Sequence, residues 1–428
     1  MKKKLITNIR TFNLKSKKND VIINYPSGNL IKKNFNNEFF YSTRWQNAKN
    51  LIKDFDYVNE VYEKNLTYLT KFLNSFHKVN LPKQYWRMLI GTWLYRFISV
   101  VFERWNTLKE INTKYKKINI EILKYNSEKF IPYGMEDFFY FINDDDWNSY
   151  IYFEIINNFK FNSINKKNKN KNLIIQDSDT IYSKLSSDNY SYKNKIFNHF
   201  QRLFLKYNNN LEYFIFDTYQ SNLDEIKINF LLNKKPLLFK SLKFYDLYPS
   251  LVSAREKISN IRNIDNKIPK NNFDYFLSNF CKKNIPKCYL EYFDLTERVL
   301  KKYMLPKKPR VIFSTLGVAG RSTLMDRYVA NKIIIGTKFI IAQHGGNYGQ
   351  HKAHWSTIHE HKISHKFLSW GFKFKSNTIP LGIIKKKLKK FKYNKDNKLI
   401  LFETRPGKTY VDNITIDNGA INFSNYIK

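Results

Sequence analysis

The residues best suited to chemistry lie close together, within residues 338–371. Six of the chain's eight histidines occur there: His344, His351, His354, His359, His361 and His365. An imidazole titrates near neutral pH, so it can take a proton from a substrate hydroxyl or ligate a metal ion. This stretch is therefore the first place to look for an active site.

His344 has the strongest chemical case. It follows an apolar run at residues 339–342, which predicts a short buried strand. The loop after that strand contains Gln343, Gly345, Gly346, Tyr348 and Gly349. Glycines let the backbone approach a ligand closely, and α/β proteins place much of their chemistry in such loops. We interpret His344 as a candidate general base, with a structural histidine bonded to the backbone as the alternative.

A β–α–β unit is predicted around this loop. An apolar run at residues 311–315 predicts one strand, a helix is expected over 323–332, and the strand before His344 completes the unit. Parallel strands joined in this way end at the same edge of a sheet. The turn from Gly317 to Arg321 should therefore lie beside the His344 loop. Arg321, near a helix N-terminus, would suit an anionic group.

Hydrophobic periodicity predicts the remaining elements. Helices are expected over residues 54–77, from Pro82 through Trp105, over 135–159 and 192–207, over 273–304 with an interruption at Pro286, and over 358–366. Strands are expected at 4–9, 214–219, 367–370 and 399–402. The second helix should bury three tryptophans, Trp86, Trp93 and Trp105. Its arginines, Arg87 and Arg104, are expected to be buried structural partners, with contacts to an acceptor as the alternative. The helix at 323–332 has Ser322 as its expected N-cap.

Two polar stretches predict surface structure. Residues 162–172 consist mostly of Lys and Asn and predict a flexible surface insertion. Residues 144–146 are three consecutive aspartates. They lack the glycine and glutamate of a calcium-binding loop, so a solvated helix turn is expected.

The chain is strongly basic. It has 74 Lys and Arg against 36 Asp and Glu, a formal net charge of +38 over 428 residues. Such a charge indicates a polyanionic partner: a nucleic acid, an anionic membrane or a phosphorylated substrate. Because Lys and Asn are spread along the whole chain, a purely compositional origin of the charge is the alternative. The length is enough for two or three domains.

Cysteine usage and hydropathy indicate the compartment. Cys281 and Cys288 are separated by six residues, which fits neither a zinc knuckle nor a disulfide framework and indicates a reducing compartment. Neither an apolar run of about 18 residues nor a signal-peptide core is found in the sequence, so a membrane-spanning helix and secretion are not expected. We expect the protein in the cytoplasm or on the inner face of the cytoplasmic membrane.

Three motifs together resemble a known family. They are Gln-His-Gly-Gly-x-Tyr-Gly at 343–349, His-Glu-x-x-Ile-Ser at 359–364 and Phe-Leu-Ser-Trp-Gly-Phe at 367–372. Aromatic and arginine residues within 85–105, and Tyr-Leu-Glu at 289–291, support the same pattern. The chain resembles, over nearly its whole length, bacterial transferases of O-antigen and other surface polysaccharides. It is more distantly similar to capsule-polysaccharide synthases and CDP-glycerol glycerophosphotransferases.

The resemblance implies an α/β, GT-B-like fold in which two Rossmann-like domains face each other across a cleft. It implies a glycosyltransferase-like enzyme without a cofactor, which transfers a sugar or related group from a nucleotide-linked donor to a polysaccharide or lipid-linked acceptor. His344 would be the general base. The family typically has Asp where this chain has His365, so Glu360 becomes the nearest acid and the second catalytic candidate. Substrate contacts are expected from the His344 loop and from Gly317, Arg321 and Arg405.

The same resemblance implies a division of the chain. Residues 1–384 would form an N-terminal, acceptor-side Rossmann-like domain with helical insertions. Residues 385–428 would be a linker and the first strand of an incomplete C-terminal donor domain. Because that domain normally supplies most of the nucleotide-sugar site, an impaired half acting as a binding or structural subunit is an alternative.

Three further functions were weighed. Spacings such as His351-x-x-His354 suit zinc, but the zincin pattern His-Glu-x-x-His is absent because position 363 is Ile, so no metal site is expected. Gly407-Lys408-Thr409 resembles the end of a P-loop, but Phe402 stands where the first glycine belongs. A basic nucleic-acid-binding protein remains an alternative, although no recognised module supports it.

Overall fold

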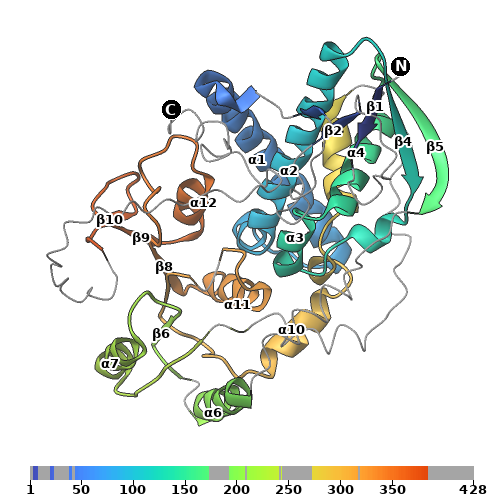
Figure 1. The fold of residues 1–428 in the computed structure, drawn as a ribbon. Coiled ribbons are helices and arrows are strands. Elements are labelled where there is room, and N and C mark those ends of the chain that lie inside the picture. Colours follow the sequence, from blue (N-terminus) through green and yellow to red (C-terminus); the bar gives the residue numbers. More distant parts are fainter. Residues whose placement is uncertain are drawn as a thin grey trace, which may run out of the picture.

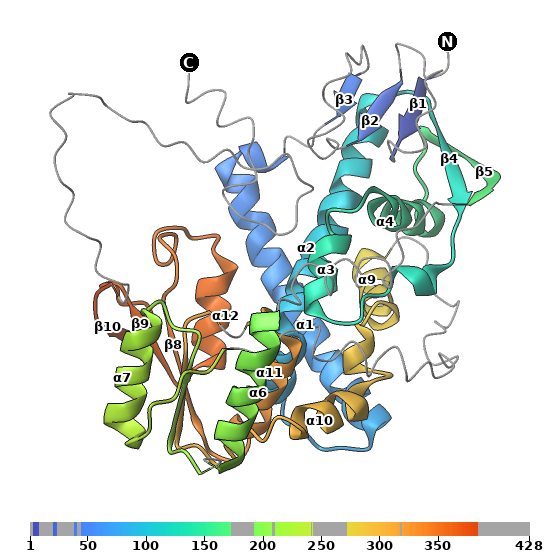
Figure 2. The ribbon, with the colours of Figure 1, turned by 60° about the horizontal axis from the view of Figure 1, so that its bottom comes forward.

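The chain forms two parallel β-sheets with long helices between them (Figures 1 and 2). The computed structural model describes residues 3–7, 20–23, 38–40, 44–172, 192–207, 210–240, 242, 272–316 and 319–383. The predicted α/β class is confirmed. Two separate five-stranded sheets occur in the region where the sequence analysis expected one Rossmann-like domain.

The first sheet has the strand order β3-β2-β1-β4-β5, with every neighbouring pair parallel. Its strands are β1 (Lys3–Ile6), β2 (Val21–Ile23), β3 (Glu38–Phe40), β4 (Ile118–Lys124) and β5 (Ile164–Asn172). The chain adds strands first on one side of β1 and then on the other, which is the doubly wound order of Rossmann-like folds. The helices of this half are η2 (Arg44–Gln46), α1 (Ala48–His77), α2 (Lys83–Lys114), η3 (Ser127–Phe130), α3 (Met135–Phe141) and α4 (Asp145–Asn158).

The predicted flexible insertion at 162–172 is wrong, because most of it forms strand β5. Residues 164–172 pair with β4 along its whole length, with a register shift between Leu123 and Lys124. Lys169 and Lys4 both form ion pairs with Glu121 of β4, at 2.6 and 3.3 Å. Backbone pairing therefore stabilises this edge strand, although its side chains carry no hydrophobic alternation that would reveal it.

The second sheet has the order β10-β9-β8-β7-β6, again entirely parallel. Its strands are β6 (Tyr213–Phe216), β7 (Val311–Ser314), β8 (Lys338–Ala342), β9 (Lys366–Ser369) and β10 (Thr378–Pro380). Helix α11 (Thr323–Ile333) joins β7 to β8, and α12 (Trp355–Ile363) joins β8 to β9. The predicted β–α–β unit is confirmed, and the carboxyl ends of these strands meet at one edge. Strand β10 was not predicted.

Apart from α7, the remaining helices lie where the periodicity predicted them. They are α6 (Tyr192–Tyr207), α7 (Asn222–Asn233), α9 (Phe273–Lys283), η6 (Lys287–Tyr289) and α10 (Phe293–Lys301). The predicted interruption at Pro286 is confirmed, since this residue is the N-cap of η6. Ser322 is the N-cap of α11, as predicted, and its hydroxyl accepts the Met325 N–H at 3.2 Å. Helix α7 has no counterpart in the sequence predictions.

Helix α2 is the centre of the hydrophobic core. Trp86 and Trp93 are buried in it, and Arg104 is fully buried. The guanidinium of Arg104 donates from Nε and Nη2 to Oδ1 of Asn148 at 3.1 and 2.8 Å and pairs with the neighbouring Glu103. A buried charge is tolerated only when it is paired and hydrogen-bonded, so the predicted structural role of Arg104 is confirmed.

A second arginine of α2 joins three helices. Arg87 forms two hydrogen bonds to the carboxylate of Glu63 in α1, at 2.6 and 2.8 Å. The same carboxylate accepts a hydrogen bond from Lys362 of α12 at 2.7 Å. Although burial opposes the charge, these hydrogen bonds from Arg87, Lys362 and Lys83 give Glu63 a net lowered pKa. The network fixes α12, which belongs to the second sheet, against α1 and α2.

The acidic run at 144–146 is not the solvated turn that was predicted. Oδ1 of Asp144 accepts the backbone N–H groups of Asp146 and Trp147, both at 2.9 Å, so Asp144 is the N-cap of α4. Asp146 is fully buried. The three carboxylates occupy the start of a helix, where the unpaired N–H groups and the helix dipole favour negative charge.

None of the helices within the described ranges is both long and apolar enough to cross a membrane.

Candidate functional site

Three loops come together at the carboxyl edge of the second sheet. They follow β6, β7 and β8, which are neighbouring strands, and they carry Tyr219, Arg321 and His344. The hydroxyl of Tyr219 donates a hydrogen bond to the backbone oxygen of His344. Arg321 is exposed, and its charge acts on both His344 and Glu360. The adjacency of the Arg321 turn and the His344 loop agrees with the sequence prediction.

His344, Tyr348 and Glu360 form a compact cluster within this edge. The hydroxyl of Tyr348 donates to Oε1 of Glu360 at 2.8 Å. The hydroxyl oxygen of Tyr348 also lies 2.9 Å from Nε2 and 3.0 Å from Nδ1 of His344. Nδ1 of His344 lies 3.9 Å from the second oxygen of Glu360, Oε2, which has no hydrogen-bond partner among the residues that the structure describes.

Burial sets the protonation of this cluster. It lowers the pKa of His344 to about 4, with smaller contributions from the charges of Arg321 and His354. Burial raises the pKa of Glu360 to about 8, although the Tyr348 hydrogen bond and Arg321 oppose the change. At neutral pH the imidazole is therefore neutral and the carboxyl is protonated. A neutral imidazole has one N–H and one lone pair, so an N–H donated to Tyr348 leaves the other nitrogen to accept a proton.

The loop around His344 is held in place by its own residues. Gln343 is buried, donates to the Gly345 oxygen at 2.6 Å, and accepts the N–H of Trp370 at 2.7 Å, at the end of the adjacent strand. Gly349 has a φ of +72°, and a Cβ there would lie 2.7 to 2.9 Å from the ring of Phe372. These two residues position the loop. In contrast, a Cβ at Gly346 would meet open space, so that position is accessible to a ligand.

Four of the other histidines have structural partners. The ring of His359 packs at 4.2 Å on Trp355, and burial lowers its pKa to about 3. His361 contacts the oxygen of Thr357 and the hydroxyl of Thr378, at 2.6 and 2.9 Å. His354 is the N-cap of α12, and Nδ1 of His365 accepts the Phe339 N–H at 3.1 Å. Within the described ranges, no three His, Cys, Asp or Glu side chains are grouped so as to hold a metal ion.

The turn after β7 is fixed by two carboxylates that the sequence analysis missed, of which Asp326 is buried and Glu136 is partly buried. Asp326 accepts the N–H groups of Ala319 and Gly320, both at 2.8 Å. Glu136 of α3 accepts the N–H of Thr323 at 2.8 Å and also its hydroxyl proton. The N-terminus of α11 thus already holds a carboxylate, which leaves the Arg321 side chain itself as the group for an anion. No local signal links Glu136 with a residue 187 positions away.

Two predicted substrate-binding residues cannot be placed. Gly317 and Arg405 lie outside the described residues, as do the strand predicted at 399–402 and the segment 385–428.

A protein-family model matches residues 24–428, and its description is the LIC12162 family transferase. The chain belongs to the LIC12162 transferase family. The family description indicates an enzyme of the transferase type, so this part of the sequence prediction is confirmed. No curated protein and no solved structure matches the chain. For this LIC12162-family transferase, the assignment of individual residues therefore rests on the geometry described above.

Proposed function

We propose that this transferase moves a sugar or related group from a nucleotide-linked donor to a hydroxyl of a surface-polysaccharide or lipid-linked acceptor. His344 acts as the general base. The observation that carries the proposal is the His344–Tyr348–Glu360 cluster at the carboxyl edge of a parallel sheet, which is the usual ligand edge in α/β proteins.

His344 has the access and the protonation state that a base requires. Its side chain is 18% exposed, whereas Tyr348 and Glu360 behind it are buried. Because burial lowers the pKa of its imidazole to about 4, the ring is unprotonated at neutral pH. The two glycines that follow it, Gly345 and Gly346, leave room for an acceptor hydroxyl to approach within hydrogen-bonding distance.

In the proposed reaction, the acceptor oxygen bonds to the transferred carbon as its proton moves to His344. The bond from that carbon to the donor's phosphate oxygen breaks, and its electron pair leaves with the phosphate. Arg321, which is exposed at the same edge of the sheet, stabilises that charge in this proposal. The new imidazolium is stabilised by the Tyr348 oxygen, whose own proton is donated to Glu360.

Donor binding and transfer can be tested separately. Calorimetric titration with a panel of nucleotides and nucleotide sugars identifies the donor, and product formation with a lipid-linked acceptor measures transfer. We expect His344→Ala to bind donor normally and to lose transfer, and Arg321→Gln to weaken donor binding. His351→Ala, a change in the same loop, is the matched control. Normal transfer by His344→Ala would refute the proposal.

A further inference from the structure

Helix α7 presents an apolar face to solvent. Leu223, Phe230 and Leu231 are 70%, 53% and 68% exposed. Lys227, also exposed, completes a set at positions i, i+4, i+7 and i+8, which lies on one side of a helix. Lys234, the C-cap of α7, is exposed at the end of the helix. Water-soluble helices normally place their apolar residues on the buried side. The outer face of α7 therefore combines apolar and basic residues in one stripe.

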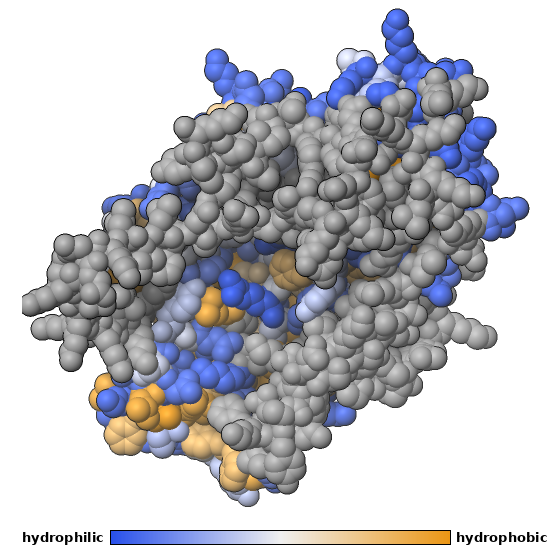
Figure 3. Space-filling view, viewed as in Figure 1, coloured by the Kyte–Doolittle hydropathy of each residue, from blue (hydrophilic) through white to orange (hydrophobic). Residues whose placement is uncertain are grey.

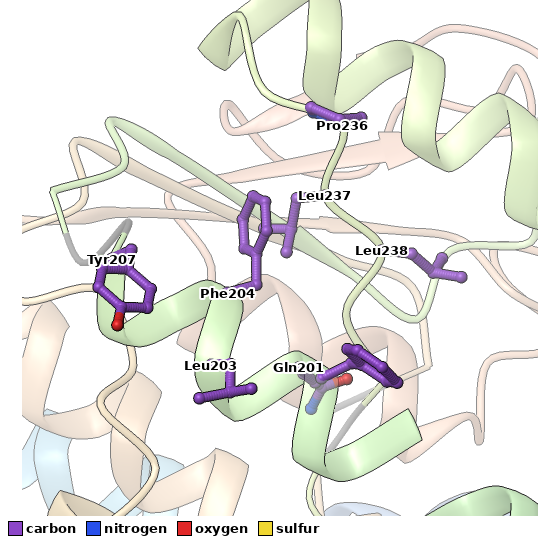
Figure 4. Close-up of a pocket in the computed structure, with 8 residues that line it drawn as sticks. Gln201, Leu203, Phe204, Tyr207, Pro236, Leu237 and Leu238 are labelled. Carbon is purple, nitrogen blue, oxygen red and sulfur yellow. The ribbon is translucent and has the colours of Figure 1, made fainter. Parts of the chain in front are cut away.

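Helix α6 continues this surface. It lies on the same side of the second sheet as α7 (Figures 1 and 2), and Tyr207 on it is 77% exposed, with Phe200 and Leu203 also exposed. A groove of about 410 Å³ opens between α6 and the segment 236–238 that follows α7 (Figure 4). Its lining is almost entirely apolar. Figure 3 shows hydrophobic residues gathered at the lower left of the molecule, over this region.

We propose that the outer faces of α6 and α7 form a docking surface for an anionic lipid bilayer. Exposed apolar residues in this number mark an interaction site. Apolar side chains interleaved with lysines suit the boundary between acyl chains and anionic headgroups. A second copy of the chain fits less well, because a symmetric contact would bring Lys227 and Lys234 of one copy against those of the other, and the chain already carries a net charge of +38.

The position of α7 connects this surface with the candidate site. Ser221 is the N-cap of α7, and Tyr219, two residues earlier, donates to the backbone oxygen of His344. Docking through α7 would hold the catalytic edge next to the membrane, where a lipid-linked acceptor would lie. This last consequence rests on the proposed function, whereas the docking surface itself does not.

Vesicle flotation with the full chain tests the docking surface. We expect the protein to float with vesicles of phosphatidylcholine and phosphatidylglycerol and to float far less with phosphatidylcholine alone. Binding should weaken as salt increases, because headgroup attraction is screened. Failure to float with the anionic vesicles would overturn the proposal.

Paired substitutions locate the contact. Phe230→Ser with Leu231→Ser should reduce vesicle partitioning about a hundredfold, and Lys227→Gln with Lys234→Gln about thirtyfold. The matched controls are Ile334→Ser with Ile335→Ser, two exposed isoleucines after α11, and Lys166→Gln with Lys167→Gln on β5. Equal losses in the control pairs would contradict the assignment to α7. The assignment to a membrane would also be contradicted if sedimentation showed a dimer that dissociates only when Phe230 and Leu231 are changed.

The docking surface and the proposed catalysis can fail independently. His344→Ala should bind vesicles as the unmodified chain does. The α7 variants should retain transfer to a water-soluble acceptor and lose it only with an acceptor embedded in vesicles. Loss of transfer to both acceptors would show that α7 acts through the fold of the site, and it would overturn the docking assignment.

Discussion

The loop after β8 and the helix α12 place the same residue type in two different surroundings. His344 in the loop is partly exposed and lies 2.9 Å from the Tyr348 hydroxyl, which is in turn bonded to Glu360. His359 in α12 is buried against Trp355, and its Nδ1 has no partner among the described residues. Burial lowers the pKa of both rings, to about 4 and about 3. A shifted pKa therefore does not identify a base. Because Nε2 of His359 also contacts a hydroxyl, that of Thr92 at 3.4 Å, it is access to solvent that distinguishes His344 as the candidate.

The largest effect expected from this comparison is on catalysis. His344→Ala should reduce kcat/KM about 10²- to 10⁴-fold, the usual contribution of a general base, while the free energy of unfolding changes little. Steady-state kinetics and urea unfolding measure the two quantities. A large loss of stability with a small loss of activity would reverse the roles assigned to the two histidines.

Substitutions around His359 should reduce the stability of the fold, in contrast with His344→Ala, which should reduce activity. A Cβ at Gly91 of α2 would lie 2.8 Å from both Cε1 of His359 and the hydroxyl of Tyr62. Gly91→Ala should therefore destabilise the fold by about 1–3 kcal/mol, despite the better helix propensity of alanine. The cost should shrink in a His359→Ala background, as a double-mutant cycle in urea would show. Gly346→Ala, at an open position, is the control that should leave stability unchanged.

The protonated state of Glu360 predicts a pH dependence of stability. Burial raises its pKa from an ordinary 4.5 to about 8, so the folded protein holds a proton that the unfolded chain releases. Stability then falls as pH rises from 4.5 toward 8. The pKa of His344 is lowered from 6.5 to about 4, so between these values the unfolded chain holds a proton that the folded protein lacks. This difference makes stability rise with pH, and the rise is complete near pH 6.5.

Between about pH 6.5 and 8, only Glu360 of these two residues should change the free energy of unfolding with pH. The unmodified chain should lose about 2 kcal/mol of unfolding free energy over that interval, and Glu360→Gln, which cannot ionise, should not. Urea unfolding of both proteins at matched pH values measures the difference, and pH effects from other groups cancel in the comparison. A constant difference between the two proteins would show that Glu360 is ionised in the folded state.

Tyr348→Phe isolates the hydroxyl that joins the cluster. Without that oxygen, the imidazolium of His344 loses a hydrogen-bond acceptor, and we expect kcat to fall about tenfold with KM nearly unchanged. Tyr140→Phe on α3, an exposed tyrosine, is the control and should behave normally. An unchanged kcat would mean that Tyr348 only packs against Phe367, which it stacks on at 5.7 Å.

The smallest expected effect is that of chelation. Both ring nitrogens of His361 contact Thr357 and Thr378, and Nδ1 of His365 accepts a backbone N–H, so these rings are committed to the fold. Treatment with a chelator should leave activity and stability unchanged. Elemental analysis of the purified protein provides the check, and stoichiometric zinc would contradict the structural assignment of these histidines.

Local sequence signals predicted the elements that carry the site. Apolar runs located β7 and β8, and Ser322 marked the start of α11, because caps and buried strands depend on neighbouring residues. Helix α12 was predicted three residues too late, since its N-cap is His354, a residue with weak capping preference. His365 keeps a role that a carboxylate could also fill, as an acceptor for the Phe339 N–H.

Long-range relations could not be predicted. The hydrogen bond from Tyr219 to the His344 loop, and the contact of Glu136 with α11, join segments more than a hundred residues apart. Of the first sheet, β1 was predicted, as the strand at 4–9, whereas β4 was overlooked although its isoleucines alternate. The other three strands carry weak signals, because β2 and β3 have three residues each and β5 lacks hydrophobic alternation. Such strands are specified by their neighbours, and a single sequence records no pairing partner.

Strand β5 also affects how the protein behaves at high concentration. It is the edge of the first sheet, and an edge strand offers unpaired backbone groups to which another chain can add. Its residues 166–172 are all lysine or asparagine, alternating from Lys167 onward, without an apolar side chain. A second molecule approaching this edge would bring its own lysines against them. The strand therefore resists edge-to-edge aggregation by electrostatic repulsion, and that resistance should weaken as salt screens the charge.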